Sequence, residues 1–111
     1  MNKEYSIDDL IILHNRICSD ARELMTEKNH DYRGGDNDPF SNFKGSTAFG
    51  VSIIDGVLIR MQDKMKRIQT FDRAGKLETI GESFYDAIVD IINYAVIIAG
   101  IIEQSKEKEK E

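Results

Sequence analysis

The sequence is poor in the features that mark secreted or membrane proteins. Its single cysteine, Cys18, cannot form a disulfide within the chain, so we expect a reducing compartment. The first ten residues, MNKEYSIDDL, lack the apolar core of a signal peptide. The longest uncharged apolar run, 91–102, has 12 residues, whereas a transmembrane helix needs about 20. These absences predict a soluble cytoplasmic protein with no membrane partner.

Basic residues are in the minority. The chain has 15 Lys and Arg against 20 Asp and Glu, a net charge of −5. Proteins that coat duplex DNA neutralise its phosphates with cationic side chains, so we expect no duplex nucleic acid as a partner. Residues 51–77 are the exception, because they carry six basic and three acidic side chains. This segment is where contacts with the phosphates of a small ligand are expected.

Several common site motifs are also missing. The sequence has no Walker loop, no GxGxxG, no zinc-type Cys/His set and no Ser/His/Asp order. No stretch alternates polar and apolar residues for long enough to indicate a strand. With 111 residues, 41% hydrophobic and 32% charged, the composition predicts one all-α domain, 1–105. A charged tail, 106–111, is expected to fray.

Three segments have helical spacing. The first starts at Ser6, with Asp9 placed as in a capping box, and is expected to run to about Lys28. The second is expected from about Ser52 to just before Gly75. The third is expected over 80–103. The result is a small bundle of three main helices plus a long loop, which is either functional or contains a short helix.

The long loop, 29–51, contains three phenylalanines, Phe40, Phe43 and Phe49. Leaving three aromatic side chains exposed to water would be unfavourable, so we consider two interpretations. Either they close the open end of the bundle, or one of them stacks on a base or sugar.

The third helix carries a polar stripe formed by Glu82, Asp86, Asp90 and Asn93. Their spacing of 4, 4 and 3 confines them to a sector of about 80°. The other side chains are mostly apolar, which indicates burial on several sides and predicts a homo-oligomer, a dimer or larger. The stripe either faces solvent or supplies oxygen ligands for Mg²⁺ or Mn²⁺.

The second helix has a complementary set, Arg60, Asp63, Lys64 and Arg67, at i, i+3, i+4 and i+7. Its cations can pair with the acidic stripe in a structural salt-bridge network, or with phosphate oxygens. Asp63 is either a further metal ligand or a partner of Arg67 one turn on.

A third group of polar residues follows the first helix. Lys28, Asn29, Asp31 and Tyr32 place an amine, an amide, a carboxylate and a phenol within reach of one small ligand.

Together these motifs resemble the phage and bacterial family called nucleotide modification associated domain, type one. The resemblance covers roughly residues 20–103 and rests on four motifs: Lys28-Asn29-x-Asp31-Tyr32, Asp38-Pro39-Phe40-x-Asn42-Phe43, Arg60-x-x-Asp63-Lys64-x-x-Arg67 and Asp86-x-x-x-Asp90-x-x-Asn93-Tyr94. That family is similar to the all-α nucleoside triphosphate pyrophosphatases of the MazG and dimeric dUTPase type. Those are homo-oligomers that hold Mg²⁺ on acidic side chains and release monophosphate and pyrophosphate.

The resemblance implies a metal-dependent nucleotide pyrophosphohydrolase of phage nucleotide metabolism, in the cytoplasm of a bacterial or phage-infected cell. The residues implied in metal binding and catalysis are Glu82, Asp86 and Asp90, with Asp63 as a further catalytic acid. The residues implied in nucleotide binding are Lys28, Asn29, Asp31, Tyr32, Arg60, Lys64, Arg67, Asn93 and Tyr94.

A second hypothesis is a non-catalytic protein that sequesters a nucleotide-derived signalling molecule at subunit interfaces. Two features favour it. The Glu-Glu pair of the pyrophosphatases is missing, because the second helix offers Asp63 alone among basic residues, and cations are plentiful there. A third hypothesis is a purely structural helical domain, which would show no rise in melting temperature with nucleotides.

Overall fold

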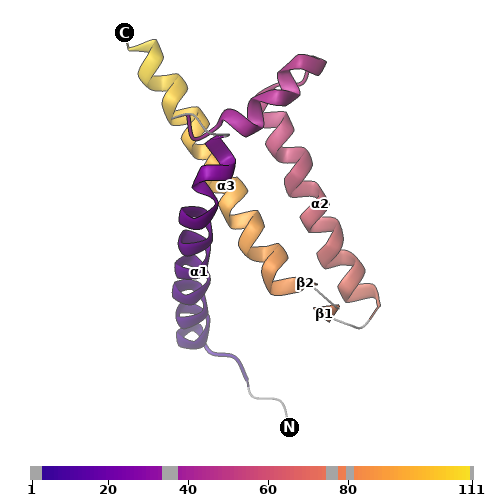
Figure 1. Ribbon diagram of the computed structural model, residues 1–111. Coiled ribbons are helices and arrows are strands. Elements are labelled where there is room, and N and C mark those ends of the chain that lie inside the picture. The colour runs from indigo at the N-terminus through magenta and orange to yellow at the C-terminus, as the bar shows by residue number, and fades with distance from the viewer. Residues whose placement is uncertain (1–3, 34–37, 75–77, 80–81, 111) are drawn as a thin grey trace.

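The computed structural model describes residues 4–33, 38–74, 78–79 and 82–110; at 29–33, 78–79 and 82–83 it describes the backbone alone. Most of the described chain is helical (Figure 1): α1 (Ile7–Arg33), the 3₁₀ helix η1 (Ser41–Phe49), α2 (Ile53–Arg73) and α3 (Phe84–Glu109). Two short strands, β1 (Glu78–Thr79) and β2 (Glu82–Ser83), pair antiparallel between α2 and α3. The predicted all-α bundle is confirmed, and the long loop does contain a short helix.

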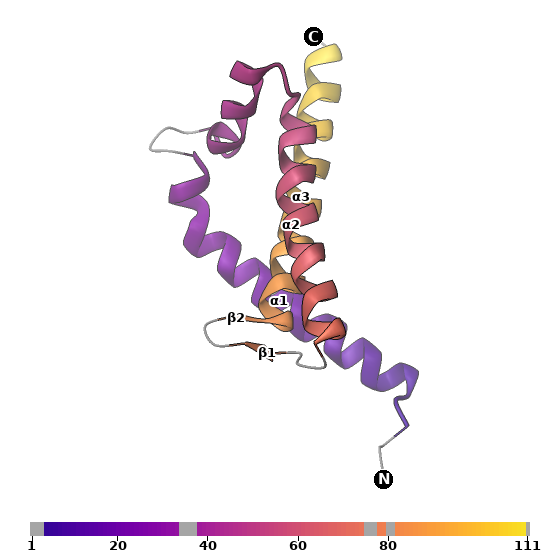
Figure 2. The ribbon, with the colours of Figure 1, turned by 90° about the vertical axis from the view of Figure 1, so that its right-hand side faces the viewer.

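The helices form two layers. α2 and α3 run antiparallel and side by side, and α1 crosses them obliquely (Figure 2). η1 packs on both α1 and α2 and lies at one end of the α2–α3 pair, whereas the β1–β2 hairpin lies at the other end.

The core lies where η1, α2 and α3 meet. Phe43, Val57, Ile97 and Ile101 form one buried cluster, and Val57 is completely inaccessible to solvent. Burying each of these side chains contributes about 1.5–3 kcal/mol relative to leaving it exposed. This cluster therefore fixes the η1 end of the bundle, while the α1 side stays more open.

Local capping explains where α1 and α2 begin. The Ser6 hydroxyl accepts from the backbone N–H of Asp9 at 3.1 Å, and the Asp9 carboxylate accepts from the backbone N–H of Ser6 at 3.0 Å. The Ser52 hydroxyl likewise accepts from the backbone N–H of Asp55 at 3.1 Å. Both predicted starts are confirmed, because each cap satisfies an N–H group that has no partner within the helix.

The other predicted boundaries need correction. α1 continues to Arg33 instead of ending near Lys28, since no glycine or proline interrupts it before Gly34. α3 begins at Phe84 instead of near Ile80, because the backbone of Glu82 pairs with that of Thr79 in the hairpin.

α3 also ends later than predicted, at Glu109 instead of near Glu103. Ion pairs at i, i+3 accompany this extension: Lys106 lies 3.8 Å from Glu103, and Lys110 lies 3.6 Å from Glu107. Such pairs stabilise a helix by a few tenths of a kcal/mol each, about 0.2–0.5.

Two of the three loop phenylalanines close the end of the bundle. Phe43 is buried in the core, and Phe40 packs against that core and against Gly100 of α3. Phe49 is 86% exposed, so the closing role is confirmed for the first two residues and is wrong for the third. Asp38 holds the start of η1 by accepting from the backbone N–H of Phe40 at 2.9 Å.

α3 is the one described helix that is long and apolar enough to span a membrane by length and composition. The core helix of a soluble protein meets the same criterion. The helix is therefore compatible with the soluble protein expected from the sequence.

Candidate functional site

The three long helices surround a cavity of about 340 Å³, which we call the three-helix cleft. Its lining residues are Leu24 and Lys28 of α1, Lys64 of α2, and Asp86, Val89 and Asp90 of α3. Four of these had been predicted as site residues, and they come from motifs far apart in the sequence. The fold therefore brings together the two lysines and the two aspartates.

An ion pair lies at the wall of the cleft. Nζ of Lys64 is 3.0 Å from Oδ2 of Asp90, and the two side chains are 19% and 16% exposed. Removing either charge from water is costly, so the pair compensates the burial of both. The pair joins Lys64, near the middle of α2, to Asp90, in the second turn of α3.

The rest of the cleft combines charge with apolar walls. Asp86 lies one turn before Asp90 on the same helix, Lys28 comes from α1, and Leu24 and Val89 provide apolar surface. Two ammonium groups therefore accompany two carboxylates, and no sign of charge is in excess. Ammonium groups at such a site can donate to the oxygens of a phosphate.

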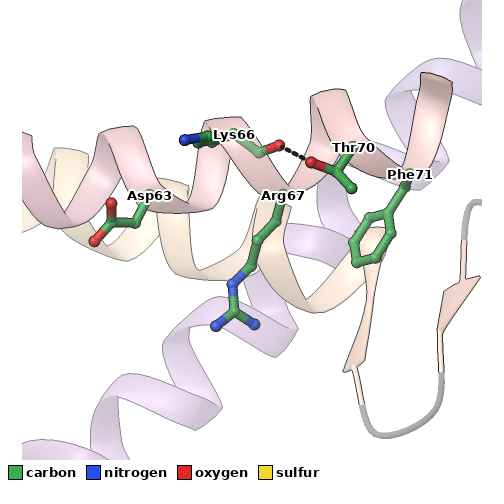
Figure 3. A pocket seen from close by; sticks show the side chains of 5 residues that line it. All are labelled: Asp63, Lys66, Arg67, Thr70 and Phe71. Carbon is green, nitrogen blue, oxygen red and sulfur yellow. Dashed lines mark hydrogen bonds between the residues drawn. The ribbon is translucent and has the colours of Figure 1, made fainter. Parts of the chain in front are cut away.

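Two predicted residues, Asp63 and Arg67, line a second cavity of about 440 Å³ together with Lys66, Thr70 and Phe71. Figure 3 shows Arg67 and Phe71 extending to one side of α2, to which Lys66 does not extend. The Thr70 hydroxyl donates to the Lys66 carbonyl at 3.0 Å. Since three residues turn a helix by about 300°, the Arg67 side chain points about 60° away from that of Lys64.

Two further predicted ligands have structural contacts. The Arg60 guanidinium lies over the Phe43 ring, 4.6 Å from its centroid, and donates to the Asn42 carbonyl at 3.3 Å. This cation–π contact ties α2 to η1. Tyr94 packs against the core cluster.

Asn93 lies in a smaller groove between α1 and α3, with a volume of about 240 Å³. The groove is lined by Cys18, Ala21, Arg22, Ile92, Asn93 and Val96. The side chain of Asn93 is 3% exposed, and within the described part of the chain its Nδ2 has no hydrogen-bond partner. A buried amide donor without a partner costs about 1–3 kcal/mol.

Four predicted side chains, those of Asn29, Asp31, Tyr32 and Glu82, lie outside the described residues. Their backbone positions are known. The first three lie on α1 instead of in a loop, and Glu82 lies in β2 instead of on the third helix. The predicted stack of three acids on one helix is therefore wrong at Glu82.

The described side chains supply Asp86 and Asp90 as possible metal ligands, and Lys64 already pairs with Asp90. Among the residues that the structure describes, no three His, Cys, Asp or Glu side chains gather as a metal site would require. Mg²⁺ or Mn²⁺ therefore stays a prediction.

One contact beside the cleft was missed from the sequence. The Tyr85 hydroxyl of α3 donates to the Asp20 carboxylate of α1, and Arg16 lies 5.4 Å from the centre of the Tyr85 ring. The hydrogen bond to Asp20 raises the pKa of Tyr85, and partial burial raises it further. The available signal was the i, i+4 spacing of Arg16 and Asp20, which places both on one face of α1.

Comparisons with protein-family models, with curated proteins and with solved structures found no match. The fold and the cleft define an all-α protein with a charged site shared by three helices. The resemblance to the nucleotide modification associated family stays a prediction that rests on the four motifs.

Proposed function

We propose that this protein binds a nucleotide or nucleotide-derived phosphate compound in the three-helix cleft and retains it intact. In this proposal the protein sequesters its ligand in the cytoplasm of a bacterial or phage-infected cell. The observation that carries the proposal is the convergence of Lys28 and Lys64 on one cavity that also has apolar walls.

The cleft supports binding by its size and charge. A volume of about 340 Å³ lies within the range of small-molecule sites, about 300–1,000 Å³. Asp90 holds the Lys64 ammonium in place before a ligand arrives, so less side-chain entropy is lost on binding. Leu24 and Val89 offer apolar surface for a base or sugar next to the phosphate contacts.

The Lys64–Asp90 pair supports retention over hydrolysis. A metal-dependent hydrolase needs carboxylates whose negative charge is free to hold the cation. Here the Asp90 carboxylate lies 3.0 Å from an ammonium group, which offsets that charge. The same ammonium favours direct contact with phosphate oxygens.

A second candidate function is metal-dependent nucleotide pyrophosphohydrolysis. The observation favouring it is the placement of Asp86 and Asp90 one turn apart in the same cleft. In that case Asp86 and Asp90 would hold Mg²⁺ or Mn²⁺, and the metal would supply activation of a water for attack on phosphorus. Asp90→Ala would then abolish turnover with helical content unchanged.

One experiment separates the candidates. The purified protein is incubated with a mixed nucleotide pool, with and without Mg²⁺, and mass spectrometry is applied to the free and the protein-bound fractions separately. We expect an intact compound in the bound fraction under both conditions, recovered unchanged after denaturation. Monophosphate that appears only when Mg²⁺ is present would instead establish the hydrolase. No retention, no turnover and no rise in melting temperature would contradict both.

A further inference from the structure

The apolar stripe of α1 packs against the rest of the molecule in its C-terminal half and is exposed in its N-terminal half. In the C-terminal half, Ala21 is buried and Met25 packs against the core cluster. In the N-terminal half, Ile7, Leu10 and Ile11 continue the stripe at helical spacing, yet they are 70%, 52% and 52% exposed. Figure 2 shows this half of α1 extending beyond α2 and α3. An apolar stripe of this kind is typical of a helix that packs on something.

The single chain is also more open than its length predicts. Its radius of gyration is 16.6 Å, with extents of 58 × 30 × 23 Å. A compact domain of this length has a radius of gyration of about 13 Å. The elongated shape is consistent with the exposed N-terminal half of α1.

The groove that holds Asn93 adjoins the same stripe. Its α1 wall includes Cys18 and Arg22, which follow Ile11 at intervals of seven and four residues, and its α3 wall includes Val96, which is 52% exposed. Asn93 itself is buried, but Arg22 and Val96 are exposed on this groove, so it offers a partner a cation beside apolar surface.

We propose that a second copy of this chain covers this face, with the two α1 helices antiparallel about a two-fold axis near position 15. The Ile7 and Ile11 side chains of each copy then lie on the groove of the other. In this register Asp8 of the second copy lies opposite Arg22. Its carboxylate accepts from the Arg22 guanidinium.

The surface favours a second copy because it contains both halves of the contact. The first turn of α1 is acidic, with Asp8 and Asp9, whereas the groove carries Arg22. The stretch from Asp8 to Arg22 is about 21 Å long at 1.5 Å per residue. In an antiparallel pair, Asp8 of each copy therefore lies opposite Arg22 of the other, so the contact occurs twice, as a two-fold interface requires.

The first test is the oligomeric state in solution, measured by sedimentation velocity over a range of concentrations. We expect the wild-type chain to form a dimer or a multiple of one. Ile11→Asp should weaken dimerisation by at least about tenfold, because it buries a charge in the interface. Ile59→Asp is the matched control, since Ile59 of α2 is also 52% exposed but lies on a different element. Circular dichroism checks that both variants keep their helices.

The second test addresses the register. Asp8→Arg and Arg22→Asp should each weaken dimerisation by about tenfold, and the double variant should restore it, because like charges repel and reversed charges attract. A monomeric wild type at every concentration would overturn the proposal. So would a double variant no better than the singles, or dissociation by Ile59→Asp instead of Ile11→Asp. None of these outcomes depends on whether the three-helix cleft binds a nucleotide.

Discussion

Lys64 of α2 and Asp90 of α3 form an ion pair with Nζ and Oδ2 3.0 Å apart, at the wall of the cleft that three helices share. If this ammonium contacts phosphate, Lys64→Met should lower affinity for the retained compound by at least about tenfold, the effect of losing roughly 1.4 kcal/mol. Isothermal titration calorimetry with the compound recovered from the nucleotide pool measures this effect.

Lys66→Met is the matched control for that variant, because Lys66 lies about 200° around α2 from Lys64 and lines other cavities. It should leave affinity unchanged. An equal loss in both variants would show that general positive charge, and not the cleft, attracts the ligand. A double-mutant cycle on Lys64→Met and Asp90→Asn should give a coupling of about 1 kcal/mol in the free energy of unfolding.

The Arg60 guanidinium lies over the Phe43 ring and donates to the Asn42 carbonyl, so we expect a structural role. Arg60→Lys should lower the free energy of unfolding by about 1 kcal/mol, since an ammonium cannot stack on the ring and keep the same hydrogen bond. Urea denaturation measures the change. Affinity for the cleft ligand should stay as in the wild type. Lost affinity with unchanged stability would return Arg60 to the ligand site.

Gly56 of α2 lies against η1. A Cβ atom there would be 2.6 Å from Oγ and 2.9 Å from Cβ of Ser46, closer than atoms can pack. Gly56→Ala should therefore destabilise the fold by about 1–3 kcal/mol, although alanine favours a helix by about 1 kcal/mol.

Gly45→Ala is the control for this substitution, because nothing lies within 4 Å of its added Cβ. Thermal denaturation of both variants should show a lower melting temperature for Gly56→Ala alone. A stabilised Gly56→Ala would mean that η1 packs less closely on α2 than the structure shows.

The Tyr85–Asp20 hydrogen bond predicts a pH dependence at the alkaline end. The Tyr85 phenol must be protonated to donate this bond, and the bond to Asp20 is the main cause that raises the pKa of Tyr85 in the folded protein. The stabilisation is therefore complete below the ordinary tyrosine pKa of about 10. It is lost as the pH rises through the raised value.

Tyr85→Phe removes this bond. The free energy of unfolding should differ between wild type and variant near neutral pH, and the difference should shrink as the pH rises above 10. Urea titrations across that range measure it. A difference that stays constant into strong alkali would contradict the assignment.

Much of the fold was predictable because it depends on neighbours in the chain. The caps at Ser6 and Ser52 are formed by residues three positions on, Asp9 and Asp55. The helical spacing of apolar residues likewise predicted three long helices. The start of α3 was not predictable in this way, because the Thr79–Glu82 backbone pairing overrides the helical spacing there.

The sequence by itself determined that cations line α2 and acids line α3. Tertiary structure decided which of them meet. Lys64 faces α3 and pairs with Asp90, Arg60 faces η1 and stacks on Phe43, and Arg67 lines another cavity. The physical reason is that side chains three or four residues apart on a helix differ in direction by about 40–60° and are about 4.5–6 Å apart along its axis, so they contact different neighbours. The packing of the neighbouring helices therefore decides which cationic side chain of α2 enters the three-helix cleft.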